Sequence, residues 1–526
     1  MDSQENLQVE DPSSRPKHVV VVLLDSLNRH LLGAYGGTEF TTPNLDRFAE
    51  KAVVFENHHT GSLPCMPARH DLLVGALDFP WRPWGSVEIW EDAITFALRQ
   101  AGVTTMLVSD HPHLFECGGE NYHIDFDAWE YVRGHENDPW KTRPDPSWIG
   151  TPALPVDEPR RGHFKYQDSR TWFKSEEDFP GPQTMQAAVR WVITNAGHHE
   201  RSLLVVDEFD PHEPFDTPEP WASMYREQGD DPWMIWPPYV IDGLKNGLIT
   251  EEEGRSLRAA YGAKLSMIDH WFGKLLDAID SSPDSDETAV IICTDHGHYL
   301  GEFDVWGKPG FPIHNTLGHI PMMIRWPGIE PRREQALTTT VDIHATLCDI
   351  YEISVDHRTH GRSLVPLVKQ KVSGVRDHCL SGYWGREVQL VTQDYTYTRG
   401  SVGDGFPLSM WSNRWSTMPV HSRPDIRLPR PDQRAYLDAM PGSSVPVIRQ
   451  PFMQGDFLPF WAYGGLKNEN LLFDRNVDPG ELDNLAAVHG TVQTDVEKSL
   501  VQRLKEALLE INAPNDVLER LGLLGN

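Results

Sequence analysis

The order of hydrophobic and polar positions predicts alternating strands and helices as far as about residue 370. The run His18–Leu24 is continuously β-branched and aliphatic, which is typical of a strand buried on both faces of a parallel sheet. Residues 250–279 repeat hydrophobic positions every three to four residues, which predicts a long amphipathic helix. Further strands are expected at 103–108, 202–206, 289–293 and 321–324, and further helices at 43–52, 90–101, 183–195 and 342–351.

This alternation predicts an α/β fold with a large, mainly parallel sheet sandwiched by helices. Two irregular insertions, 112–182 and 213–248, are long enough to be functional loops. Beyond residue 370, Val388–Thr398 alternates like a half-exposed strand and 494–511 is an amphipathic helix. The expected parts are a polar N-terminal extension (1–17), an α/β domain (18–370) and a smaller C-terminal α+β domain (371–526).

Composition excludes several classes of partner. The 526 residues include 47 Lys and Arg against 77 Asp and Glu, so the formal net charge is −30. A chain this acidic lacks the basic surface that binds nucleic acids or anionic membranes. The longest aliphatic run, Val19–Leu24, is far shorter than the roughly 20 residues of a membrane span. We therefore expect no nucleic-acid partner and no membrane.

The N-terminus and the cysteines indicate in which cell compartment the protein is expected. Residues 1–17 are polar and have no apolar core of a secretory signal. Five cysteines, an odd number, do not form a disulfide framework in a chain of this length. The simplest location is the reducing cytoplasm, and the sequence is compatible with a homo-oligomer.

Polar residues follow two of the predicted strands. Asp25 comes directly after His18–Leu24, and Asp295 and His296 follow 289–293. Ligands of open α/β sheets bind at the carboxyl ends of strands, where two Asp and one His would suit a divalent cation. An Asp after a strand can also simply cap the next helix.

A third feature is Cys65-Met-Pro-Ala-Arg69, followed by Leu73-Val-Gly75. A Cys that enters a helix at Pro67 lies near backbone N–H groups that favour anions. A lone Cys is more often an inert buried side chain. Cys-x-Pro-x-Arg with a downstream Leu-x-Gly, however, resembles the signature of the type I sulfatases, within the alkaline phosphatase superfamily.

The resemblance continues in the family's order over about residues 18–485. The segments similar to family motifs are Thr42-Pro-Asn-Leu-Asp46, Asp210-Pro-His-Glu-Pro214, Thr294-Asp-His-Gly297, Trp306-Gly-Lys308 and Asp478-Pro-Gly-Glu-Leu482. The resemblance implies an alkaline phosphatase-like fold for the large sheet.

In that family a dedicated enzyme reads Cys-x-Pro-x-Arg and oxidises the cysteine to formylglycine. The resemblance therefore implies that Cys65 becomes formylglycine and that a formylglycine-generating enzyme is a partner. One oxygen of the hydrated aldehyde can attack sulfur or phosphorus while it is bound to the metal. The other hydroxyl then collapses to the aldehyde and expels sulfate.

Roles follow from position in the motifs. The expected ligands of one divalent cation are Asp25, Asp295, His296 and an oxygen of the modified Cys65. Arg69 can hold the diol oxygen, one helical turn from Cys65. His212 would contact the transferred group or protonate the leaving oxygen, and Lys308 would place a positive charge on the substrate oxyanion.

The sequence departs from the family pattern in three places. Ser26 replaces the second Asp of the opening pair, which leaves open whether residue 26 reaches the metal. His296 stands where many sulfatases have Asn, which moves the preference from Ca²⁺ toward Mn²⁺ without excluding Ca²⁺. The family's Lys-Trp-His segment reads Ser109-Asp-His-Pro-His113, so the lysine is absent and either His111 or His113 fills the histidine position.

Three functions remain to be compared. The first is hydrolysis of sulfate monoesters of a small organic substrate, and the second is hydrolysis of phosphonate monoesters or phosphodiesters with the same nucleophile. His296 and the missing lysine favour the second. The third, a catalytically silent binding protein, conflicts with the intact Cys-x-Pro-x-Arg. We prefer the first, and the acidic surplus favours a small anionic ester over a polyanion.

Overall fold

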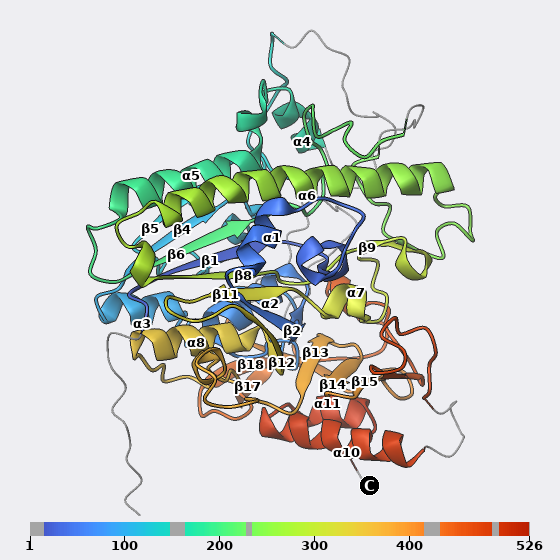
Figure 1. Cartoon of the computed structure of the whole chain (residues 1–526). Coiled ribbons are helices and arrows are strands. Elements are labelled where there is room, and N and C mark those ends of the chain that lie inside the picture. The colour runs from blue at the N-terminus through green and yellow to red at the C-terminus, as the bar shows by residue number, and fades with distance from the viewer. Residues whose placement is uncertain (1–14, 148–163, 228–233, 415–431, 487–493, 525–526) are drawn as a thin grey trace, which may run out of the picture.

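The protein is described by a computed structural model covering residues 15–147, 164–227, 234–414, 432–486 and 494–524. Its centre is an eight-stranded sheet of order β12-β2-β11-β8-β1-β6-β4-β5 (Figure 1). The strands are β1 (His18–Leu24), β2 (Val53–His59), β4 (Thr104–Ser109), β5 (Ala128–Tyr131), β6 (Ser202–Glu208), β8 (Thr288–Cys293), β11 (Met322–Arg325) and β12 (Arg332–Thr339). Within this sheet, only β11 runs antiparallel to its neighbours. The predicted mainly parallel sheet is confirmed.

Helices cover both faces of this sheet (Figure 1). One layer consists of α1 (Pro43–Ala49), α5 (Pro180–Asn195) and α6 (Glu251–Asp280); the other consists of α2 (Cys65–Val74), α3 (Ile94–Gln100) and α8 (Val341–Tyr351). Alternate residues of β1 divide between the two cores: Val20, Val22 and Leu24 face the first layer, and Val19, Val21 and Leu23 face the second. This division explains why β1 is apolar at every position from Val19 to Leu24.

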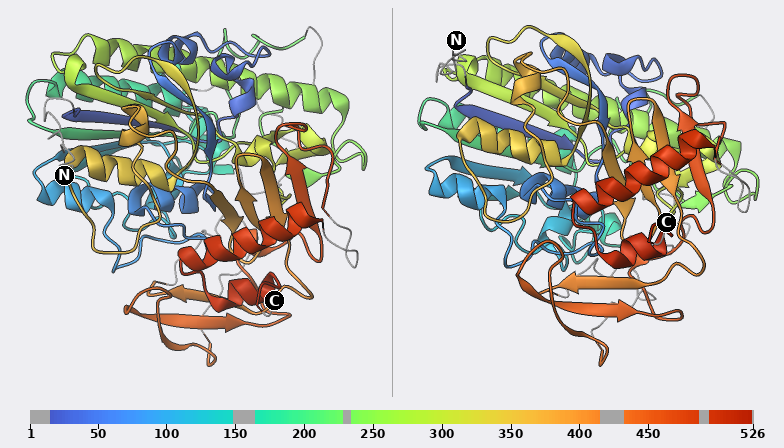
Figure 2. Two further views of the ribbon diagram at one scale, coloured as in Figure 1. Left: turned by 60° about the horizontal axis from the view of Figure 1, so that its bottom comes forward. Right: turned by 90° about the horizontal axis from the view of Figure 1, so that it is seen from below.

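The C-terminal segment adds smaller sheets (Figure 2). Its five-stranded sheet has the order β19-β15-β14-β13-β3, with β13 (Cys379–Tyr383), β14 (Val388–Val391), β15 (Tyr395–Arg399) and β19 (Asn470–Asp474). The edge strand β3 (Ser62–Leu63) comes from just before Cys65 and pairs in parallel with β13. The C-terminal sheet is therefore joined directly to the segment that leads into Cys65. The domain boundary at residue 370 stays a prediction.

The single strand expected at Val388–Thr398 is a hairpin of β14 and β15. Its turn is closed by the amide of Thr392, which donates to the carbonyl of Tyr395 at 2.8 Å. The hairpin is mostly buried rather than half-exposed. Its apolar face packs against α10 (Asp495–Glu510), while on the other face Gln389 donates to the carbonyl of Ile313 at 2.7 Å.

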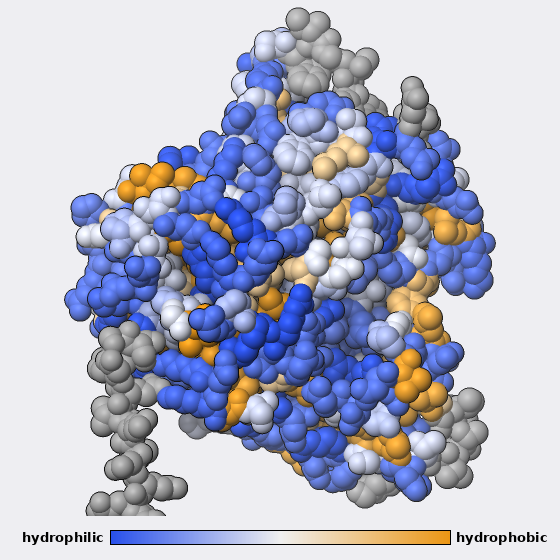
Figure 3. Space-filling view, viewed as in Figure 1, coloured by the Kyte–Doolittle hydropathy of each residue, from blue (hydrophilic) through white to orange (hydrophobic). Residues whose placement is uncertain are grey.

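The remaining elements are short. They are α4 (Phe164–Arg170), α7 (Asn315–Gly318), α9 (Val365–Val368), α11 (Asn515–Arg520), β7 (Val240–Ile241), β9 (Tyr299–Leu300), β10 (Val305–Gly307), β16 (Leu408–Ser412), β17 (Tyr436–Ala439) and β18 (Pro446–Phe452). No helix among the described residues has both the length and the apolar character that crossing a membrane requires. The face in Figure 3 is mainly hydrophilic, with apolar side chains in small separate patches. Most of the predicted N-terminal extension, residues 1–14, lies outside the described residues.

Candidate active site

Four side chains from three places in the chain converge at one edge of the sheet. Asp25 follows β1 and Asp295 and His296 follow the adjacent parallel strand β8, so the two strand ends lie side by side. Cys65 is the first residue of α2, and its Sγ lies 3.2 Å from Nε2 of His296. One ligand atom from each of the four buried residues lies within 4.8 Å of the others. The structure thus brings together all four predicted metal ligands.

Helix α2 holds Cys65 rigidly. All ten of its residues are buried, and the carboxylate of Asp71 accepts hydrogen bonds from the backbone amide (2.6 Å) and hydroxyl (2.8 Å) of Ser62. The helix ends at Gly75, whose φ of 77° is in the left-handed region. A Cβ atom there would come within 2.4 Å of Nδ1 of His344. The glycine of the Leu-x-Gly pattern is therefore required both by conformation and by space.

Arg69 ties the carboxylates of the site together. Its Nε and Nη2 donate to Asp207 at 2.8 and 2.7 Å, and its Nη1 donates to Asp295 at 3.0 Å. Its Nη2 also lies 2.9 Å from Oδ2 of Asp25. At Cys65 the guanidinium contacts the backbone carbonyl at 3.2 Å, so the expected contact with the converted side chain stays a prediction. Asp207 was not among the predicted site residues. It lies near the end of β6, and a carboxylate at the end of a strand is the same feature that pointed to Asp25.

Lys308 brings a positive charge beside Cys65. Its Nζ lies 3.8 Å from Sγ of Cys65 and 3.4 Å from the hydroxyl of Ser26. Burial alone would lower the pKa of Lys308, but Cys65, Tyr239 and Glu213 hold that pKa well above its usual value. The hydroxyl of Ser26 donates to Oδ1 of Asp25 at 2.8 Å, so residue 26 orients a predicted ligand.

The structure separates the two candidate histidines. Nε2 of His111 lies 3.7 Å from Oδ2 of Asp25, and neither of its buried ring nitrogens has a hydrogen-bond partner in the part of the chain that the structure describes. His113 instead lies between Glu116 (2.9 Å) and Glu136 (3.2 Å). Burial alone would lower the pKa of His113, but these carboxylates raise it to about 10. The geometry therefore places His111, and not His113, beside the clustered ligands.

Matched substitutions test this assignment. His111→Ala should lower kcat/KM for an ester substrate by about 10²-fold or more, because a group beside the reacting atoms is lost. His113→Ala should instead lower the unfolding midpoint in urea. The His113 pKa is raised on folding, so its stabilisation is complete below the unfolded pKa of about 6.5 and is lost as pH rises through about 10. Equal losses of kcat/KM in the two variants would refute the assignment.

His212 lies in the loop after β6. Its Nδ1 is 2.8 Å from the carbonyl of Glu213, and its ring stacks on Phe209 with centroids 4.1 Å apart. Burial, with a contribution from Lys308, lowers the pKa of His212 well below its usual value. Two neighbours that sequence reasoning missed, Glu213 and His298, are joined by a contact of 3.2 Å. Glu213 lies inside the segment Asp210–Pro214 that resembles a family motif, but neither residue was given a role, because each acquires its partner only through folding.

The donor set fits a divalent cation. The carboxylates of Asp25 and Asp295 are buried next to each other and repel. Burial and this repulsion raise the pKa of Asp25 well above its usual value. Oδ2 of Asp25 is fully buried and has no hydrogen-bond partner among the described residues, although it lies 2.9 Å from Nη2 of Arg69 in an ion pair. Burial also lowers the pKa of His296 to about 4, which keeps the imidazole neutral, the form that binds metals. A cation would relieve the repulsion between the two carboxylates and would give Oδ2 of Asp25 a second positively charged neighbour beside Arg69.

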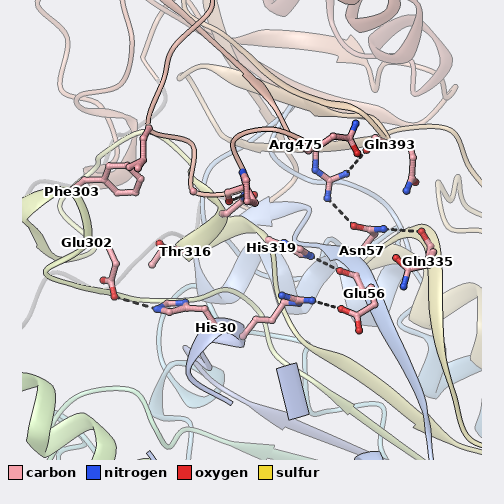
Figure 4. A pocket seen from close by; sticks show the side chains of 16 residues that line it. His30, Glu56, Asn57, Glu302, Phe303, Thr316, His319, Gln335, Gln393 and Arg475 are labelled. Atoms are coloured by element: carbon pink, nitrogen blue, oxygen red, sulfur yellow. Dashed lines mark hydrogen bonds and ion pairs between the residues drawn. The ribbon is translucent and has the colours of Figure 1, made fainter. Parts of the chain in front are cut away.

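A separate cavity of about 750 Å³ lies where the large sheet meets the C-terminal segment (Figure 4). Its carboxylates are already paired: Glu56 contacts Arg29 at 2.5 Å, and Glu302 contacts His30 at 3.2 Å. Arg475 donates to the side chain of Asn57 at 2.9 Å. None of the four clustered ligands lines this cavity.

Comparison with known proteins decides the family. A family model described as Sulfatase matches residues 17–353. The chain belongs to the sulfatase family. This sulfatase is 28% identical over 374 residues to a choline-sulfatase of Rhizobium meliloti, covering 67% of this chain and 71% of the relative. It is 23% identical to an arylsulfatase of Clostridium perfringens over 69% of this chain and 80% of the relative.

A solved structure confirms the fold class. The phosphonate monoester hydrolase of Agrobacterium radiobacter superposes with a TM-score of 0.63 at 18% identity, covering 95% of this chain and 96% of that one. Membership of the family makes the chain a sulfuric ester hydrolase acting on an anionic sulfate ester. It also implies a divalent metal and a formylglycine, with which the cluster around Cys65 is compatible. The resemblance found in the motifs is confirmed.

Proposed function

We propose that this sulfatase hydrolyses sulfate monoesters of a small organic substrate with a formylglycine made from Cys65. The observation that carries the proposal is the buried cluster of Asp25, Cys65, Asp295 and His296, whose ligand atoms lie within 4.8 Å of one another. The cysteine of this cluster begins a helix in the Cys-x-Pro-x-Arg context. A formylglycine-generating enzyme is the partner that this context requires.

The proposed cation is Mn²⁺ or Ca²⁺, held by Asp25, Asp295, His296 and the converted Cys65. When bound, it would neutralise charge on the ester oxygens and lower the pKa of the attacking hydroxyl. Two carboxylates suit either ion, and the neutral imidazole of His296 favours Mn²⁺. Arg69 supports this site by orienting both carboxylates through contacts of 2.9 and 3.0 Å.

The other roles belong to side chains that surround Cys65. Lys308, 3.8 Å from Sγ, is placed to hold an anionic oxygen of the ester. The unpartnered ring of His111 can donate a hydrogen bond to the transferred group. His212 is proposed to give a proton to the leaving oxygen as the ester bond breaks. These basic groups offset the net charge of −30 locally, which favours a small anion over a polyanion.

A second candidate function is hydrolysis of phosphonate monoesters or phosphodiesters by the same residues. Two observations favour it: His296 is the fourth member of the cluster, and the segment 109–113 has no lysine. The family match and the sulfatase relatives favour the sulfate ester. We therefore keep the sulfate ester as the main function.

Side-by-side turnover tests the choice. The protein, co-expressed with a formylglycine-generating enzyme, is stripped of metal by a chelator and then given Ca²⁺ or Mn²⁺ alone. We expect the ion that binds to raise the melting temperature and to restore hydrolysis of 4-nitrophenyl sulfate, because it relieves the repulsion between Asp25 and Asp295. A kcat/KM for an aryl phosphonate that exceeds the sulfate value by about 10²-fold or more would establish the second function instead.

A further inference from the structure

One buried carboxylate lies in the site without a role in the proposed function. The side chain of Glu213 is about 5% exposed. Its Oε2 lies 3.3 Å from Nδ1 of His212 and 3.2 Å from Nε2 of His298, and its Oε1 accepts a hydrogen bond from the hydroxyl of Tyr239. Three side chains from three separate segments thus converge on one carboxylate.

The same residue also holds His212 through its backbone. Nδ1 of His212 lies 2.8 Å from the carbonyl oxygen of Glu213. A carbonyl and a carboxylate are both acceptors, so Nδ1 must carry the ring proton that faces them. The hydrogen bond of the His212 ring within the described residues is made by Nδ1, which leaves Nε2 for the substrate.

We propose that Glu213 is a positioning residue that fixes Nδ1–H of His212 and so prepares Nε2 to protonate the leaving oxygen. This inference rests on the proposed function of the site. In the step concerned, the deprotonated hydroxyl oxygen of the converted Cys65 forms a bond to sulfur as the bond between sulfur and the leaving oxygen breaks. The electron pair of the broken bond stays on the leaving oxygen, and the proton on Nε2 of the imidazolium transfers to that oxygen. The neutral ring, still held at Nδ1, regains its proton from solvent.

Charge around His212 explains why a carboxylate is needed there. Lys308, His298 and His111 are the basic groups that face the ring, and each disfavours a second proton on His212. Glu213 is the neighbouring group that opposes them. Burial alone would raise the pKa of Glu213, but His212, Lys308 and His298 hold that pKa well below its usual value, so the carboxylate is ionised. An ionised group next to Nδ1 stabilises the imidazolium that the step consumes.

The test compares two sulfate esters whose leaving oxygens differ in how much they need a proton from His212. 4-Nitrophenyl sulfate releases a weakly basic oxygen, whereas phenyl sulfate releases a more basic one. Glu213→Gln should lower kcat/KM for phenyl sulfate by about 10²-fold but for 4-nitrophenyl sulfate by less than about fivefold. Glu213→Asp, which keeps the charge, should recover part of the difference between the esters. An equal loss on both esters would show a purely structural role and overturn the inference.

A second measurement does not depend on turnover. In histidine-labelled protein, with the signal assigned by His212→Asn, the pKa of His212 should fall by about one unit or more in Glu213→Gln. An unchanged His212 pKa would overturn the inference. Glu481→Gln is the matched control, because Glu481 is a buried carboxylate 3.1 Å from Nδ1 of His314, outside the site. It should change neither the ratio between the esters nor the His212 signal.

The two measurements also separate this inference from the proposed function. If the wild-type protein hydrolyses neither sulfate ester, the proposed function fails. The histidine titration then decides alone whether Glu213 controls His212. If the wild type is active and Glu213→Gln shows no preference between the esters, only the inference about Glu213 fails.

Discussion

Replacing Cys65 with alanine is expected to lower kcat/KM for 4-nitrophenyl sulfate by about 10⁵-fold or more. The reason is that the substitution removes the only side chain of the cluster that can be converted to formylglycine, whose hydrated aldehyde carries the attacking oxygen. The fold should survive, because alanine fills most of the space of a buried cysteine and is well tolerated in a helix. Steady-state kinetics and a thermal melt measure the two effects.

Mass spectrometry supplies the companion test. Conversion of Cys65 removes one sulfur and two hydrogens and adds one oxygen, a change confined to the peptide that carries residue 65. Cys65→Ser, which keeps a hydroxyl but cannot be converted to an aldehyde hydrate, is the matched control and should not turn over repeatedly. Full activity of a protein whose Cys65 is still a thiol would contradict the formylglycine mechanism.

Replacing Arg69 with methionine is expected to destabilise the protein by about 3–5 kcal/mol. Arg69 is buried against three carboxylates, those of Asp25, Asp207 and Asp295, at 2.7–3.0 Å. Methionine fills a similar volume but leaves those charges uncompensated in a buried site. Urea unfolding of the metal-free protein measures the change in the free energy of unfolding.

Arg434 is the matched control for this prediction. It also contacts two carboxylates, Asp432 and Asp456, but its side chain is 30% exposed. Because solvent screens such pairs, Arg434→Met should leave the free energy of unfolding nearly unchanged. Similar losses in the two variants would show that the buried position of Arg69 gives it no special weight.

Much of the fold follows from local patterns. The β-branched run of β1 and the periodicity of α6 appear in the structure within one residue of their expected ends. The carboxyl ends of β1 and β8 carry Asp25 and Asp295, and parallel pairing of those strands brings the carboxylates together. Strand period, strand ends and the Cys-x-Pro-x-Arg signature are properties of neighbouring residues, so they could be read without coordinates.

Pairings between distant segments could not be read from local sequence patterns. Arg69 donates to Asp207, which is 138 positions away in the chain. His111 lies beside Asp25, whereas His113 is paired with Glu116 and Glu136. The turn between β14 and β15 was not predicted, because the alternation of apolar and polar residues continues through it.

The sequence alone therefore predicted the family, the fold class and the three residues, Asp25, Asp295 and His296, that cluster around Cys65. Tertiary structure added the partners of those residues: Asp207 behind Arg69, Glu213 beside His212, and β3 joined to the C-terminal sheet. The physical reason is that ion pairs and hydrogen bonds in a buried site depend on which segments meet in space. The local order of side chains does not show which distant segments will meet.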